Sequence, residues 1–378
     1  MIYMRMDIST RAQNISASIT LAISAKAKRM QEDGINVINF TVGEPDFNTP
    51  DYIIDAAKRA IDAGHTKYTA SAGILALRKA ICEKLKRDNG LVYSPNQIVV
   101  ANGAKQALAG AILALVNPGD EVIIPAPFWI TYPELVKLAG GVPVFVQGGE
   151  DFKITAQQLA GAITSKTKAV ILNSPNNPSG AVYTEAELRA FAGVLGDVWV
   201  ISDEVYENLI YRGKHFSIAK VHPKTVVING FSKTYAMTGW RIGYSASSVE
   251  VADAIENFQS HMTSNVNSIT QYAALAALQG AEGEKFLEDM LAEFDRRRKY
   301  MVERISKMRG VSCNSPDGAF YVMVKMGVSA EELLDNARIA TVPGEAFGAA
   351  GYIRFCYTVS MENIIEGMDR LEAYLKGV

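Results

Sequence analysis

Short apolar runs alternate with longer stretches of helical periodicity through the middle of the chain. The runs are a few residues long and nearly all apolar, which is typical of strands buried on both faces of a parallel sheet. The predicted strands are residues 98–101, 122–124, 144–146, 169–172, 198–202, 226–229 and 242–245. The predicted helices are residues 51–63 and 74–87 before the first of these strands, residues 104–116 after it, and one that runs to residue 195 from the capping box of Thr184 and Glu187. This alternation predicts an α/β fold with a mostly parallel central sheet flanked by helices.

The pattern changes towards both ends of the chain. Residues 16–34 predict a helix that Gly34 closes, and residues 37–40 predict a short strand. The tail contains a long helical stretch at 284–308, short strands at 320–324 and 352–356, and a final helix at 361–375. This mixture predicts a smaller α+β part, separate from the central sheet.

Composition excludes some classes of protein. The 378 residues are enough for about two to three domains with a large core. The formal net charge of −2, without a strongly basic stretch, argues against a nucleic-acid partner. The basic cluster at residues 296–299 lies in an acid-rich helical stretch and is predicted to form a solvated face. No run is long and apolar enough to cross a membrane.

The cysteines and the first residues of the chain indicate in which cellular compartment the protein is expected. Cys82, Cys313 and Cys356 are widely separated and odd in number, which argues against a disulfide framework and against a zinc site. Reduced cysteines fit a cytoplasmic protein. Arg5 and Asp7 interrupt the first residues, so no signal peptide is predicted. The four histidines show no metal-ligand spacing.

Residues 230–243, GFSKTYAMTGWRIG, carry the strongest chemical signal. Lys233 follows an apolar strand on a turn of small residues, and Arg241 comes eight positions later. A partly desolvated lysine near another cation has a lowered pKa and is nucleophilic towards carbonyls. An arginine suits a phosphate because its planar fork offers several donors. The pair indicates a Schiff base to a phosphorylated aldehyde, with a solvated lysine and a structural arginine as the alternative.

This segment and three other blocks resemble the class I aminotransferases, of fold type I of the pyridoxal phosphate (PLP) enzymes. The blocks are TVGEPDF at residues 41–47, SPNNPSG at 174–180, SDEVYE at 202–207 and YIRFCYTVS at 352–360. They follow the order of the family. The resemblance implies the PLP-dependent transferase fold type I with PLP as cofactor. It also implies a small domain made of residues 1–46 and 281–378, and a large PLP-binding domain at 47–280.

The resemblance assigns the cofactor's phosphate to a cup formed by two segments. Gly103, Ala104 and Lys105 lie between a strand and a helix, where backbone N–H groups at a helix N-terminus reach a phosphate. Arg241 completes this cup.

Two further positions bear on the same phosphate. Tyr68, in KYTASAGILALR, matches a residue that crosses a dimer interface to the partner's phosphate, with a packed loop tyrosine as the alternative. Many relatives carry a phosphate-binding serine where this chain has Gly230. The sequence leaves open whether Ser232 takes its place.

Four residues are implied around the cofactor ring. Asp203 ends an apolar strand, at the sheet edge where ligands bind, and is expected to keep the pyridine nitrogen protonated. A helix N-cap is the alternative role for Asp203. Tyr206 and Asn177 match the positions that hydrogen-bond the ring's 3-oxygen, and Trp129 matches the aromatic that stacks on the ring. The catalytic residues implied are Lys233, Asp203 and Tyr206.

The substrate-binding residues follow from the same resemblance. Arg354 lies in a strand-like run, where an unpaired charge would be costly, and matches the arginine that grips the substrate α-carboxylate. Gly43 matches the glycine beside that carboxylate, and Trp129 and Asn177 also border the substrate. Lys105 lies in a first helical turn, where the helix dipole disfavours a cation. In one subgroup of aspartate aminotransferases, a lysine at this position contacts the distal carboxylate of a dicarboxylic substrate.

The sequence therefore predicts a cytoplasmic homodimer with active sites at the subunit interface, acting on L-aspartate and 2-oxoglutarate. Aromatic, alanine and kynurenine aminotransferases and a β-lyase on the same fold are the alternatives. Ser16 stands where prephenate-accepting members carry a lysine, which does not favour prephenate. A PLP-binding regulator would need an appended DNA-binding module. A nicotinamide dehydrogenase would need a G-x-G-x-x-G turn that opens a helix after the first strand, and the sequence carries no such turn.

Overall fold

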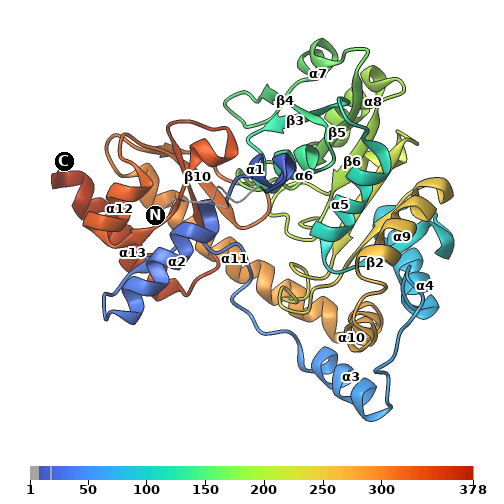
Figure 1. Cartoon of the computed structure of the whole chain (residues 1–378). Coiled ribbons are helices and arrows are strands. Elements are labelled where there is room, and N and C mark those ends of the chain that lie inside the picture. The colour runs from blue at the N-terminus through green and yellow to red at the C-terminus, as the bar shows by residue number, and fades with distance from the viewer. Residues whose placement is uncertain (1–7, 18, 378) are drawn as a thin grey trace, which may run out of the picture.

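A computed structural model describes residues 8–17 and 19–377 of the chain. Residues 1–7 of the predicted small domain, residue 18 of the predicted helix 16–34 and residue 378 lie outside the described residues. Figure 1 shows a large sheet with helices on both faces, beside a smaller part in which segments from the two ends of the chain come together.

The large sheet has seven strands in the order β2-β8-β7-β6-β5-β3-β4. Their bounds are β2 (Ile98–Ala101), β3 (Glu121–Ala126), β4 (Val142–Gln147), β5 (Thr167–Asn173), β6 (Trp199–Asp203), β7 (Thr225–Gly230) and β8 (Gly243–Ala246). Only β8 pairs antiparallel with its neighbours, β2 and β7. The prediction of a mostly parallel sheet is confirmed.

Most strands of this sheet are buried on both faces, as their apolar runs predicted. Val99 and Ala101 pack against α5 on one face, while Ile98 and Val100 pack on the other. The prediction is wrong for β4, because it pairs only with β3 and forms an edge of the sheet. Phe145 on β4 keeps 47% of its surface exposed.

Helices cover both faces of the sheet. Those of the first face are α5 (Ala104–Leu115), α6 (Thr131–Leu138) and α9 (Val249–Met262). Those of the second are α3 (Asp51–Asp62), α4 (Leu75–Lys84), α7 (Ala156–Ala162), α8 (Glu185–Leu195) and α10 (Ser268–Gln279). The predicted capping box opens α8, since Thr184 accepts from the Glu187 N–H and Glu187 accepts from the Thr184 N–H. The predicted helix 74–87 changes to a π-helical turn, η1 (Leu85–Asn89), before it ends at Gly90.

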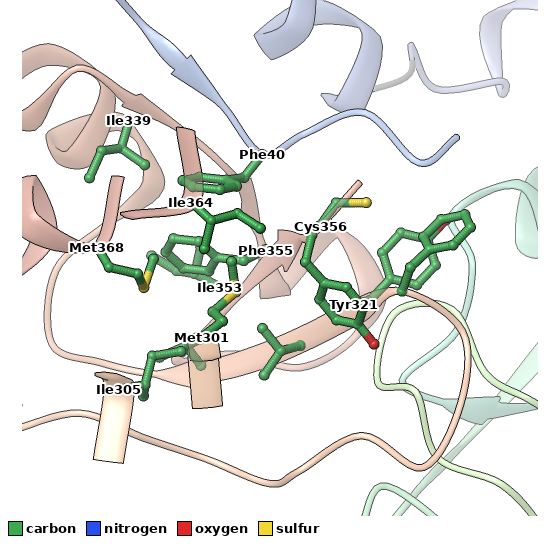
Figure 2. Close-up of a cluster of buried hydrophobic side chains, with 14 of the residues drawn as sticks. Phe40, Met301, Ile305, Tyr321, Ile339, Ile353, Phe355, Cys356, Ile364 and Met368 are labelled. Atoms are coloured by element: carbon green, nitrogen blue, oxygen red, sulfur yellow. The ribbon is translucent and has the colours of Figure 1, made fainter. Parts of the chain in front are cut away.

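The smaller part combines the beginning and the end of the chain. Its helices are α1 (Thr10–Gln13), α2 (Ile19–Glu32), α11 (Glu282–Ser306), α12 (Ala330–Ala337) and α13 (Met361–Gly377). A four-stranded sheet has the order β12 (Val342–Pro343), β13 (Tyr352–Cys356), β10 (Tyr321–Lys325) and β9 (Ser312–Cys313). Separately, β1 (Ile38–Asn39) pairs in parallel with β11 (Ile339–Ala340). Figure 2 shows the shared core, where Phe40 from the N-terminal segment packs with Phe355 of β13.

The remaining elements are short 3-10 turns, η2 (Pro95–Gln97), η3 (Ile218–Lys220) and η4 (Gly344–Phe347). None of the helices in the described part of the chain is long and apolar enough to cross a membrane. The domain boundaries at residues 46 and 280 stay predictions.

The prediction of a solvated face at residues 296–299 is wrong for its two middle arginines. Arg297 is buried and donates to Asp46, at 2.8 Å, and to Glu293 on its own helix. Arg298 is buried and donates to Asp295 and to Ser315. Because α11 lies between other elements, one side of the basic cluster faces the interior, where each guanidinium requires a partner.

Candidate active site

A cavity of about 870 Å³ lies where the large sheet meets the smaller part of the molecule. Strands of the large sheet end at this cavity, which is where open α/β sheets bind ligands. The cavity brings together most of the predicted site residues. Those that line it are Gly43, Ala104, Lys105, Trp129, Asn177, Asp203, Tyr206, Lys233, Arg241 and Arg354.

Lys233 lies three residues after the end of β7 and extends into the cavity. Its Nζ donates to the Gly43 carbonyl at 2.7 Å. The pKa of Lys233 is lowered from 10.5 to about 8, chiefly by burial and also by Arg241 and Arg354, against the opposing effects of Cys356 and Glu44. A larger fraction of neutral amine is therefore available near neutral pH than for an exposed lysine.

A buried network supports the turn that carries Lys233. The Glu207 carboxylate accepts from Asn229 of β7 at 2.7 Å, from Asn89 at 2.5 Å and from Lys84. Burial would raise the pKa of Glu207, but Lys84 and His215 hold it below its usual value. An ionised Glu207 thus ties the end of β7 to η1, behind the cavity.

Asp203 is the last residue of β6 and is buried at the floor of the cavity. The Tyr132 hydroxyl donates to its Oδ2 at 2.7 Å, and the Val205 N–H approaches its Oδ1 at 3.4 Å. Burial raises the pKa of Asp203 to about 6, although both hydrogen bonds act in the opposite direction. A buried carboxylate with neutral partners favours a nearby cationic group.

Arg354 is buried on β13, and its Nη1 donates to Asn177 Oδ1 at 3.0 Å. Its Nη2 donates to the Thr41 carbonyl at 2.7 Å. Its Nε has no hydrogen-bond partner among the described residues, although it is buried. The guanidinium is thus fixed in direction by two of its five N–H donors and keeps others, including Nε–H, for an anion.

Arg241 and Gly103 meet at another part of the site. Arg241 has a left-handed backbone (φ 55°), and its guanidinium donates to the Thr238 carbonyl at 2.8 Å. Gly103 has a left-handed backbone (φ 87°), which favours glycine, and a side chain there would also come within 2.5 Å of Arg241 Nη2. Gly103 directly precedes α5, so the Arg241 guanidinium lies close to the turn that opens this helix. A cation beside a helix N-terminus forms an anion site.

Lys105 lies in the first turn of α5, within the same cavity. Its Nζ lies 4.8 Å from the centre of the Trp129 ring. Burial lowers the pKa of Lys105, and the nearby Arg241 lowers it further. The cationic side chains of Arg354, Lys105 and Arg241 thus line the same cavity as Lys233.

Comparison with known proteins identifies the family. The profile of the aminotransferase class I and II family matches residues 35–371. The chain belongs to this family. It is 45% identical to an aspartate aminotransferase of Bacillus sp. (strain YM-2), over 98% of this chain and 99% of that protein. It is also 45% identical to an aspartate/prephenate aminotransferase of Cereibacter sphaeroides, with the same coverage.

Solved structures agree with this assignment. An aspartate aminotransferase from Thermus thermophilus with maleate superposes with a TM-score of 0.95 at 41% identity, covering 97% of this chain and 99% of that chain. One from Rhizobium meliloti gives a TM-score of 0.94 at 40% identity, covering 98% and 99%. The predicted fold type I architecture is confirmed for this aminotransferase.

Two predicted site residues are not among the described residues that line the cavity: Gly103, which adjoins the lining residue Ala104, and Tyr68. The Tyr68 side chain is 88% exposed. A tyrosine that packs in a loop of its own chain would be buried. The exposure leaves Tyr68 free to reach a second chain.

Two tyrosines in the site were missed by the sequence analysis. Tyr132 on α6 holds Asp203 and contacts the Trp129 ring edge-on, with centroids 5.5 Å apart. Tyr321, at the start of β10, places its hydroxyl 2.7 Å from that of Tyr206. Tyr132 follows Trp129 at helical spacing, which could have indicated a shared face, but Tyr321 carries no comparable sequence signal.

Proposed function

We propose that this aminotransferase uses pyridoxal 5′-phosphate to move an amino group between L-aspartate and 2-oxoglutarate, giving oxaloacetate and L-glutamate. The observation that carries the substrate assignment is the position of Lys105, in the same cavity as Arg354. A dicarboxylate offers two anionic groups, and each of these two cations suits one of them. Relatives that are named aspartate aminotransferases, and the Thermus structure that contains maleate, support this assignment.

The side chains of the cavity fit the proposed cofactor. Arg241, the Gly103 turn and the N-terminus of α5 suit a phosphate. The buried Asp203, with neutral partners, suits a protonated pyridine nitrogen. Lys233 offers an amine of lowered pKa, and Trp129 offers an aromatic face. When bound, PLP supplies an aldehyde for the amine and an electron-withdrawing ring.

Side chains of the protein would then move the proton, stabilise the charge on the ring and orient the substrate. The Lys233 amine, once free, would act as general base and acid, taking the proton from the substrate Cα and delivering it to C4′, the carbon that belonged to the cofactor's aldehyde. Asp203 holds a positive charge at the ring nitrogen, and Tyr132 fixes the direction of its carboxylate. Arg354 orients the α-carboxylate, because Asn177 and the Thr41 carbonyl already fix its guanidinium.

Replacement of Lys105 tests the substrate assignment. Lys105→Ala should raise the KM for aspartate, glutamate and their keto acids by about ten- to two-hundredfold, the effect of a lost charge-assisted hydrogen bond. Alanine and phenylalanine should change little, since they have no second carboxylate. Steady-state kinetics with each donor would measure this selectivity.

Two controls make the result specific. Cofactor occupancy must be measured in each preparation, because Lys105 lies close to Arg241 of the phosphate cup. Lys137→Ala removes another lysine that lines the cavity but pairs with Glu134, and should leave the substrate preference unchanged. If fully loaded Lys105→Ala is impaired equally with aspartate and phenylalanine, the dicarboxylate assignment is wrong.

The proposed enzyme is a cytoplasmic homodimer with active sites at the interface between subunits. Exposed apolar side chains on α4 and α9, including Leu75 and Met262, support a contact surface beside the edge strand β2. The exposed Tyr68 precedes α4 in the chain and supports a role in the partner's site.

A further inference from the structure

We propose that Tyr321 is a positioning residue that links the Tyr206 hydroxyl to the Arg354 guanidinium, so that one side chain adjusts both the cofactor side and the carboxylate side of the cavity. The inference rests on the proposed use of PLP. It assigns a role to a residue that neither the sequence motifs nor the geometry of the catalytic lysine requires.

The backbone before Tyr321 is held in a costly conformation. Ala319 has a left-handed backbone (φ 55°), which non-glycine residues rarely adopt. Its N–H donates to the Leu209 carbonyl at 2.8 Å, and its own carbonyl accepts from the Tyr211 hydroxyl at 2.5 Å. This turn leads into β10 and directs the buried Tyr321 side chain into the cavity.

The hydroxyl of Tyr321 has Tyr206 as its hydrogen-bond partner, at 2.7 Å. Each tyrosine hydroxyl has a single proton to donate. If Tyr206 donates to the cofactor's 3-oxygen, the proton between the two tyrosines must come from Tyr321. Hydrogen bonds in such a chain polarise one another, so Tyr321 makes Tyr206 a stronger donor.

The ring of Tyr321 contacts Arg354, the proposed carboxylate-binding residue. Arg354 Cζ lies 4.6 Å from its centroid, and 4.9 Å from that of Phe347, so the guanidinium contacts two aromatic rings. Such contacts stabilise a cation and restrict its plane. A side chain at Gly43 would come within 2.5 Å of the Tyr321 hydroxyl oxygen, so Tyr321 also accounts for the glycine at that position. Hydroxyl and ring thus act on different partners and can be removed separately.

Tyr321→Phe removes the hydroxyl and keeps the ring. The pKa of the bound cofactor's visible chromophore should rise by about 0.5, a shift of roughly threefold in proton affinity, because a weaker Tyr206 donor stabilises the deprotonated form less. The affinity of the dicarboxylate inhibitor maleate should change by less than about twofold. Tyr321→Leu removes the ring too, and should in addition weaken maleate binding by about threefold or more. Spectrophotometric pH titration and inhibitor titration of the holoenzyme measure both effects without turnover.

The double variant Tyr206→Phe/Tyr321→Phe shows whether Tyr321 acts through Tyr206 or only fills space. Tyr206→Phe should raise the chromophore's pKa more than Tyr321→Phe, and adding Tyr321→Phe to it should cause no further rise, because the path through Tyr206 is already lost. Tyr300→Phe removes a tyrosine hydroxyl on α11 that accepts from Arg304 and does not line the cavity, and should leave the chromophore's pKa unchanged.

Two results would overturn the inference. One is an unaltered chromophore pKa in Tyr321→Phe, and the other is a full additional shift in the double variant. Failure of the proposed function would look different, because the unsubstituted protein would then carry no titrating chromophore at all.

Discussion

At the residue scale, burial of the Lys233 amine lowers its pKa and so determines its reactivity. The Nζ lies 5.6 Å from the centre of the Phe320 ring and 5.9 Å from that of Tyr206, so aromatic surface replaces part of the water around the charged form. Because the pKa falls from 10.5 to about 8, the ammonium form predominates below pH 8 and the reactive amine above it. An exposed lysine would become reactive only at a higher pH.

The reactivity of Lys233 in the cofactor-free protein should therefore have its midpoint near pH 8. Competitive acetylation followed by peptide mass spectrometry measures this midpoint, with exposed lysines, which gain reactivity up to pH values above about 10, as internal references. A Lys233 midpoint equal to theirs would contradict the assignment.

In the loaded protein, borohydride should fix the cofactor on the peptide that contains Lys233, and not on any other lysine.

At the scale of elements, the strand pattern was enough to predict where several site residues gather. Asp203 ends β6, and Lys233 follows β7 closely. The carboxyl ends of parallel strands meet at one edge, so residues that follow them converge whatever their separation in the chain. The motif resemblance added which roles these residues would have.

The remaining contacts depend on how elements pack, which strand and helix periods do not encode. Tyr321 reaches Tyr206 only because the start of β10 lies beside the segment that follows β6. Arg297 was predicted to be solvated because it lies in a charged stretch. Its partner, Asp46, lies far away in the sequence and could not be identified from that stretch. The apolar run of β4 likewise gave no sign that no strand would cover its outer edge.

The hydrogen-bonded ion pair between Arg297 of α11 and Asp46 of the N-terminal segment should contribute to the stability of the fold. Arg297→Met should lower the free energy of unfolding by about 2 kcal/mol, because it leaves Asp46 without its charged donor. The neighbouring Arg296→Met removes an exposed arginine and should change stability by less than about 0.5 kcal/mol. Thermal unfolding followed by circular dichroism compares the two variants. Equal melting temperatures would show that the Asp46 contact adds nothing.

At the scale of the whole molecule, the exposure of Tyr68 supports the proposal that one chain does not complete its own site. Tyr68 is exposed in the single chain, while Ala104, Lys105 and Arg241 of that chain line the cavity. The proposed homodimer would bring the partner's copy of this tyrosine to the phosphate.

Mixed dimers test this arrangement. A dimer of one Lys233→Ala chain and one Tyr68→Ala chain should contain one intact site, with Lys233 from the second chain and Tyr68 from the first. Its activity should approach half that of the parent dimer, whereas each variant alone should be impaired. Purification with two different affinity tags isolates the mixed species. If it is no more active than the Tyr68→Ala homodimer, Tyr68 does not act across an interface.

The pairing of β1 with β11 has a consequence for the order in which the site is built during translation. The large sheet needs only residues 98–246, and these already include Asp203, Lys233 and Arg241. The segment with Thr41 and Gly43 finds its partners, β11 and Arg354, only when the last part of the chain has been made. Since domains fold as they emerge from the ribosome, we infer that the nascent chain forms its cofactor-binding surface first. It would acquire its grip on the substrate carboxylate only as synthesis ends.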